Sequence, residues 1–83
     1  MFLLKIYSYG GLCNLCGKRV KEARQRNQIT QEQLAARMQV EGVQISQKAV
    51  SRIESGERVV ADYELLILSK VLGVPLEWLM GKD

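Results

Sequence analysis

Histidine is absent from the 83 residues, and only two cysteines and one proline occur. Without histidine, a Ser-His-Asp triad is excluded and most zinc sites lose a ligand. The apolar start of the chain is too short to cross a membrane, and it lacks the long core and cleavage site of a signal peptide. These absences predict a cytoplasmic protein that is not an enzyme and that holds no cofactor and no metal.

The length of the chain predicts a single domain with a limited core and no separate ligand-sensing or catalytic unit. We expect this domain to occupy residues 17–81. Residues 1–16 form a different, apolar segment, interrupted by Tyr9-Gly10-Gly11. This segment is interpreted as a disordered tail, as a strand at residues 2–7 that pairs with a second copy, or as residues that precede the natural start.

Cys13 and Cys16 stand at a Cys-x-x-Cys spacing, which invites a metal or redox interpretation. Zinc needs four ligands, so such a site would have to be shared between subunits, and no βαβ pattern supports a thioredoxin-like motif. Cys16 also lies at helical spacing from Val20 and Ala23. We therefore interpret it as a small apolar residue at the start of the buried stripe of a first helix.

Positive charge is concentrated in one part of the chain. Residues 18–58 hold nine Lys and Arg against five Glu, whereas residues 59–83 hold two Lys against four acidic residues. A local excess of cations favours contact with phosphates, although a soluble surface often shows an imbalance of this size.

The most informative stretch is residues 46–56, where Ser46 is a suitable N-cap and Gly56 suits the left-handed position after a helix. Its apolar residues share one helical face. The opposite face carries Gln47, Lys48, Ser51, Arg52 and Ser55. Long side chains that donate or accept in pairs can read base edges in the major groove, but an ordinary solvated helix is polar on one side as well.

Neighbouring segments predict the helices that support this stretch. A basic helix is predicted from Gly17 to about Gln28, with Arg24 facing inward and in need of a partner. Thr30 and Gln33 form a capping box for the next helix. Asp62 is expected to cap a helix that ends near Gly73, and Pro75 starts a short final helix.

Three blocks of sequence carry a family resemblance. They are Ile29-Thr30-Gln31-Glu32-Gln33-Leu34-Ala35, then residues 46–56, then Leu72-Gly73-Val74 with Trp78-Leu79. In this order they resemble the phage-repressor and Cro type of helix-turn-helix, the xenobiotic response element family of bacterial regulators. The resemblance covers residues 17–81 and implies an all-α, five-helix, lambda-repressor-like DNA-binding domain.

The resemblance also implies roles for individual residues. Gln47, Lys48, Ser51 and Arg52 are expected to face bases or nearby phosphates, and Gln31 to contact a phosphate at a helix N-terminus. Lys18, Arg19 and Arg58 are expected to add phosphate contacts. Arg24 and Glu54 match a structural ion pair that touches no base. The chain departs from the family in one respect, since the connection before Ser46 is about five residues longer than usual.

The helix at residues 62–72 is apolar on more than one side, which is typical of an enclosed or shared helix. We expect a homodimer interface formed by Tyr63, Ile67, Val71, Trp78 and Met80, unless the N-terminal segment covers these residues instead. The predicted function is a repressor that binds double-stranded, palindromic operator DNA as a homodimer. The alternative is an antitoxin or protein-interaction module with a protein partner.

Overall fold

The computed structural model describes residues 9–82, which fold into five helices. Their bounds are α1 Gly17–Arg26, α2 Gln31–Val40, α3 Gln47–Ser55, α4 Asp62–Leu72 and α5 Leu76–Leu79. The all-α fold predicted from the sequence is confirmed. The strand considered at residues 2–7 lies outside the described residues.

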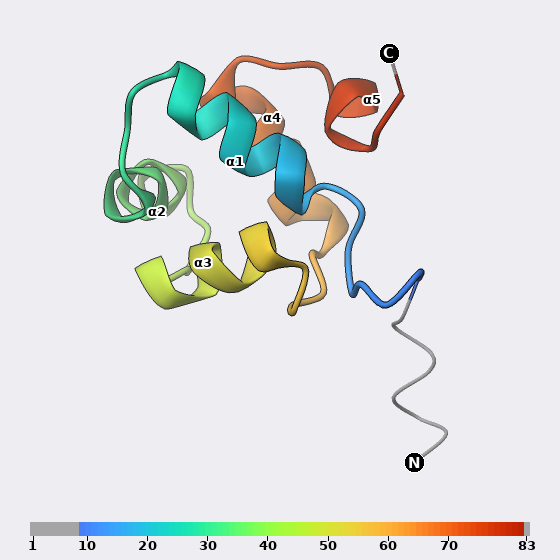
Figure 1. Ribbon diagram of the computed structural model, residues 1–83. Helices are drawn as coiled ribbons and strands as arrows, with labels where there is room; N and C mark the ends of the chain where they lie inside the picture. Colours follow the sequence, from blue (N-terminus) through green and yellow to red (C-terminus); the bar gives the residue numbers. More distant parts are fainter. Residues whose placement is uncertain (1–8, 83) are drawn as a thin grey trace.

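The five helices pack around one core, and α3 lies at its edge (Figure 1). In that view α1 crosses the middle of the bundle with α4 behind it, α2 and α3 lie to the lower left, and α5 closes the upper right. The largest fully buried side chains come from every helix: Leu34, Met38, Ile53, Leu68, Leu79, Val20 and Val50. Thus α3 contributes its apolar face to the core and leaves its other face outward.

Local sequence signals set most helix ends. The hydroxyl of Thr30 accepts the backbone N–H of Gln33 at 3.0 Å, and the Gln33 side chain accepts the N–H of Thr30 at 2.8 Å, as the capping box predicts. Ser46 caps α3 by accepting the N–H of Ala49 at 3.1 Å. Gly56 ends α3 with a φ of 82°, in the left-handed region that glycine favours.

Two helix ends differ from those predicted. α1 stops at Arg26 rather than at Gln28, because Gln28 takes a φ of 56° and turns the chain toward α2. The N-cap of α4 is Ala61 rather than Asp62. The carboxylate of Glu64 accepts the Ala61 N–H at 2.9 Å, which fixes the start of the helix one residue earlier than expected.

The lengthened connection between α2 and α3 is anchored in the core. Residues 41–46 form it, and the side chains of Val43 and Ile45 are buried. The N–H of Val43 bonds to the carbonyl of Met38, and the Gln39 side chain donates to the carbonyl of Ile45 at 2.6 Å. The extra residues therefore hold the start of α3 in place.

Cys16 packs in the core, as its spacing from Val20 and Ala23 predicts. Burial removes the thiol from water and raises its pKa to about 11, which disfavours the reactive thiolate. Within residues 9–82, no cluster of three or more Cys, Asp or Glu side chains is placed to hold a metal ion. No helix in this part of the chain has the length and hydropathy needed to span a membrane.

Candidate nucleic-acid interface

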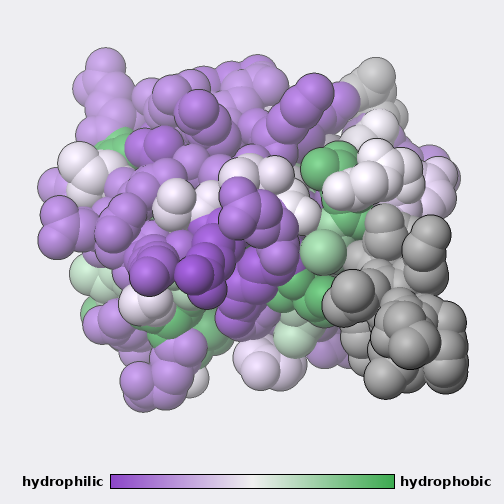
Figure 2. Space-filling view, turned by 60° about the horizontal axis from the view of Figure 1, so that its bottom comes forward, coloured by the Kyte–Doolittle hydropathy of each residue, from purple (hydrophilic) through white to green (hydrophobic). Residues whose placement is uncertain are grey.

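The outward face of α3 is polar and open. Val50 and Ile53 are buried beneath it, whereas Gln47, Lys48 and Arg52 are exposed and Ser51 is half-buried. Figure 2 turns the side of the molecule that carries α3 toward the reader, and most of this side is hydrophilic. A shallow hollow of about 240 Å³ lies along the helix, lined by Ser46, Lys48, Ala49, Arg52, Glu57 and Arg58.

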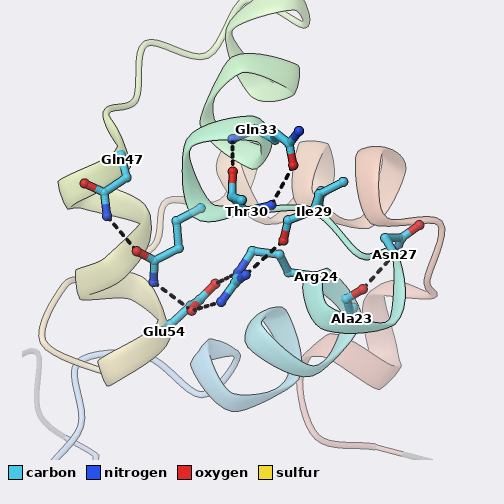
Figure 3. Close-up of polar contacts among 9 residues, drawn as sticks. Ala23, Arg24, Asn27, Ile29, Thr30, Gln33, Gln47 and Glu54 are labelled. Atoms are coloured by element: carbon cyan, nitrogen blue, oxygen red, sulfur yellow. Dashed lines mark hydrogen bonds and ion pairs between the residues drawn. The ribbon is translucent and has the colours of Figure 1, made fainter.

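A chain of hydrogen bonds links this face to the interior (Figure 3). The Nε2 of Gln47 donates to the Oε1 of Gln31 at 2.6 Å, and the Nε2 of Gln31 donates to the Oε1 of Glu54 at 3.0 Å. These bonds fix which way both amide groups point. The carbonyl oxygen of Gln47 remains on the outer side of the pair as an acceptor.

This series of hydrogen bonds ends at an ion pair that joins α1 to α3. Arg24 contacts Glu54 through Nε–Oε2 at 2.6 Å and Nη2–Oε1 at 3.1 Å, and its Nη1 donates to the carbonyl of Ile29 at 2.9 Å. Only 12% of the Arg24 side chain and 4% of the Glu54 side chain are exposed. Hydrogen bonding to Glu54 raises the pKa of Arg24 above its ordinary value. The structure thus brings together the two residues expected to pair.

The cations expected to touch phosphate differ in their surroundings. Lys18 is exposed on the first turn of α1, beside a small pocket that Ser55 also lines. Arg19 instead donates to the carbonyl of Trp78 at 3.2 Å, and its guanidinium carbon lies 4.6 Å from the centre of the Trp78 ring. This contact ties α1 to α5. Lys18 is therefore better placed than Arg19 to meet an anion.

Arg58 is held by Glu64. Its two terminal nitrogens each contact a Glu64 carboxylate oxygen at 2.8 Å. The role of Glu64 was not predicted from the sequence, although a glutamate three residues after an N-cap is a known helix-start signal. The Arg58 guanidinium lowers the pKa of the Glu64 carboxyl below its ordinary range. This pair anchors the segment after α3 to α4.

The lowered pKa of Glu64 predicts a pH-dependent contribution to stability. Folding stabilises the ionised carboxylate, so the contribution is complete above the unfolded pKa of about 4.3 and is lost as the pH falls further. Glu64→Gln should therefore destabilise the protein most at pH 7, and wild type and variant should converge in acid. Urea unfolding across this pH range checks the prediction, with the exposed Glu32→Gln as control. A difference that stays constant with pH would contradict it.

The five residues expected at a dimer interface are not equally exposed. Tyr63 and Met80 are 62% and 49% exposed, whereas Ile67, Val71 and Trp78 are partly buried against the core. Leu66, which was not among the residues predicted for the interface, is 56% exposed on α4. The exposed large apolar side chains of α4 and of the C-terminal segment are thus Tyr63, Leu66 and Met80.

Comparison with known proteins places this arrangement in context. A helix-turn-helix family profile matches residues 20–79. The crystal structure of the P22 c2 repressor protein, in complex with synthetic operator 9T in the presence of Tl⁺, is 30% identical to this chain and superposes with a TM-score of 0.71. The match covers 84% of this chain and 98% of that one. No curated protein sequence matches.

Proposed function

This chain belongs to the Cro- and C1-type helix-turn-helix family of DNA-binding transcriptional regulators, and from that premise we propose that it is a sequence-specific repressor. It binds a palindromic operator as a homodimer and blocks transcription by occupancy. The main support for this proposal is the outer face of α3. Its polar side chains are accessible to solvent, while the opposite face of the helix packs against the core. The repressor structure with bound operator that resembles this chain supports the same interpretation.

Base recognition is assigned to Gln47, Lys48, Ser51 and Arg52. The fixed amide of Gln47 suits adenine, and Arg52 or Lys48 suits guanine. Each good bidentate contact discriminates against the wrong base by ~1 to 3 kcal/mol. Because Gln47 is already bonded to Gln31, it loses little conformational freedom when it meets a base.

Phosphate contacts are assigned to Lys18 and to the start of α2. Exposed backbone N–H groups at a helix N-terminus favour an anion, and Gln31 occupies the first position of α2. Arg19 and Arg58 add positive potential, but their contacts with Trp78 and Glu64 compete with a direct phosphate contact. We therefore assign them a smaller part of the affinity than the sequence suggested.

The test of this function is selection from random duplex DNA at two salt concentrations. A sequence-specific dimer should enrich a palindrome whose half-sites are about one helical turn apart, and its affinity should fall as salt rises. Binding without an enriched sequence would show a non-specific DNA-binding protein. Absence of any binding would reject the proposal.

The dimer is assigned to the outward apolar surface of Tyr63, Leu66 and Met80. Leu66→Lys should weaken self-association and operator binding together while leaving the helix content unchanged, because this side chain points away from the core. Sedimentation velocity and operator titration measure both effects. Val40→Lys is a matched control, since Val40 is an exposed apolar residue at the end of α2. Equal sedimentation of wild type and Leu66→Lys would argue against this interface.

The same apolar surface favours a second candidate, in which the domain is an antitoxin or interaction module with a protein partner. Such a partner would be retained in stoichiometric amount by the wild-type chain and lost with Leu66→Lys. That result, combined with a failed DNA selection, would replace the repressor proposal.

A further inference from the structure

Asn14 lies before the first helix and outside the residues that match the family profile, yet it contacts the end of α3. Its Nδ2 donates to the carbonyls of Ile53 at 3.1 Å and Arg58 at 2.8 Å. Its Oδ1 accepts the backbone N–H of Gly17 at 2.8 Å. One amide group thus joins the start of α1, the last turn of α3 and the segment that follows it.

The surrounding backbone is packed closely at the same point. The N–H of Cys13 donates to the carbonyl of Gly56 at 2.8 Å. At Gly17, a side-chain methyl would lie only 2.3 Å from the carbonyl oxygen of Ile53, so a larger residue would force the two helices apart. Leu12 lies directly against Gly56. Residues 12–17 therefore pack closely against the C-terminal end of α3 and bond to it.

The two ends of α3 are held by different devices. Its N-terminal end is held by the Ser46 cap and by the bond between Gln47 and Gln31. Its C-terminal end, which follows directly after Arg52, is held by the Arg24–Glu54 ion pair on one residue and by the Asn14 amide on the neighbouring carbonyl of Ile53. A helix fixed at both ends keeps a constant angle to the domain, and base contacts depend on that angle.

We propose that Asn14 is a positioning residue for DNA recognition, which sets the orientation of the last turn of α3 and so of Arg52. The inference rests on the proposed DNA-binding function. It means that the segment before residue 20, where the family profile begins, contributes to sequence discrimination. Asn14 itself touches no base.

The two halves of the amide can be separated by substitution. Asn14→Ser keeps an oxygen that can accept the backbone N–H of Gly17 but loses the amide donors that reach the carbonyls of Ile53 and Arg58. Asn27→Ser is the matched control. The Asn27 amide donates to the carbonyls of Ala23 at 2.8 Å and Leu72 at 3.1 Å. It therefore joins α1 to α4, and neither of these bonds reaches α3.

The experiment measures the affinity of the full-length variants for the selected operator and for random duplex, at a temperature where circular dichroism shows wild-type helix content. Asn14→Ser should lower the ratio of the two affinities by about tenfold, comparable to one mismatched base pair, with random binding unchanged. Asn27→Ser should leave the ratio as in wild type. If Asn14→Ser does not fold, Asn14→Thr, which also keeps a hydroxyl acceptor, loses the amide donors and adds no charge, replaces it.

An unchanged ratio in the folded Asn14 variant, or an equal fall in both Asn variants, would overturn the positioning role. Failure of the underlying function is distinguishable, because wild type itself would then show no preference for the operator. A fall in affinity for both DNAs by the same factor would also overturn the inference, since it would indicate loss of phosphate contact rather than of orientation.

Discussion

Glu54→Ala should lower the free energy of unfolding by about 3 to 5 kcal/mol, the usual effect of removing one partner from a buried ion pair. The loss is large because the groups that pair with the Glu54 carboxylate would stay in place without a partner. Arg24 would stay largely buried without its two bonds to the carboxylate, and Gln31 would lose an acceptor. Urea unfolding at pH 7 measures the loss.

Glu22→Ala is the control for the Glu54 prediction. Glu22 pairs with Arg26 on the exposed surface of α1, and exposed pairs of this spacing contribute only about 0.3 to 0.5 kcal/mol. The Arg24→Ala and Glu54→Ala double variant should lose less than the sum of the single variants, because the second change removes a charge already unpaired. Losses of similar size for Glu54→Ala and Glu22→Ala would show that the buried pair does not hold α1 to α3.

Arg52→Ala should reduce the preference for operator over random duplex by about 10- to 100-fold, because the bidentate base contact proposed for Arg52 would be lost. The Arg52 side chain is exposed, so its truncation should leave the fold intact. Competition binding with both DNAs measures the change, and circular dichroism verifies the fold.

Lys18→Ala separates base recognition from charge. Lys18 is also exposed and cationic, but it lies on α1, so its removal should weaken all sequences alike. The slope of log affinity against log salt should fall by about 1. Equal losses on operator and random DNA for Arg52→Ala would reject its role in reading bases.

The sequence predicted the supporting fold because the signals for it are local. Caps such as Ser46 and Thr30 act within one turn, and helical spacing alone identifies the buried face of α3. The Arg24 and Glu54 pair followed from an inward charge together with the family resemblance. Helical spacing likewise predicted which polar side chains of α3 point outward.

The remaining contacts depend on how distant segments meet. Nothing near Asn14 in the sequence indicates that its amide reaches Ile53 and Arg58. Likewise, Arg58 pairs with Glu64 only because the turn into α4 brings them together. The sequence did not indicate this pairing, so Arg58 was assigned to phosphate. The apolar excess of α4 was visible, but the division between core-facing Ile67 and outward Leu66 required the packed structure.

Whether α3 enters the DNA is tested most directly by backbone amide NMR during titration with the selected operator. The largest shift changes should fall on residues 47, 48, 51 and 52 of α3 and at the start of α2, with smaller changes along the outward side of α4. Large changes confined to α4 and α5, with α3 unaffected, would contradict the proposed interface.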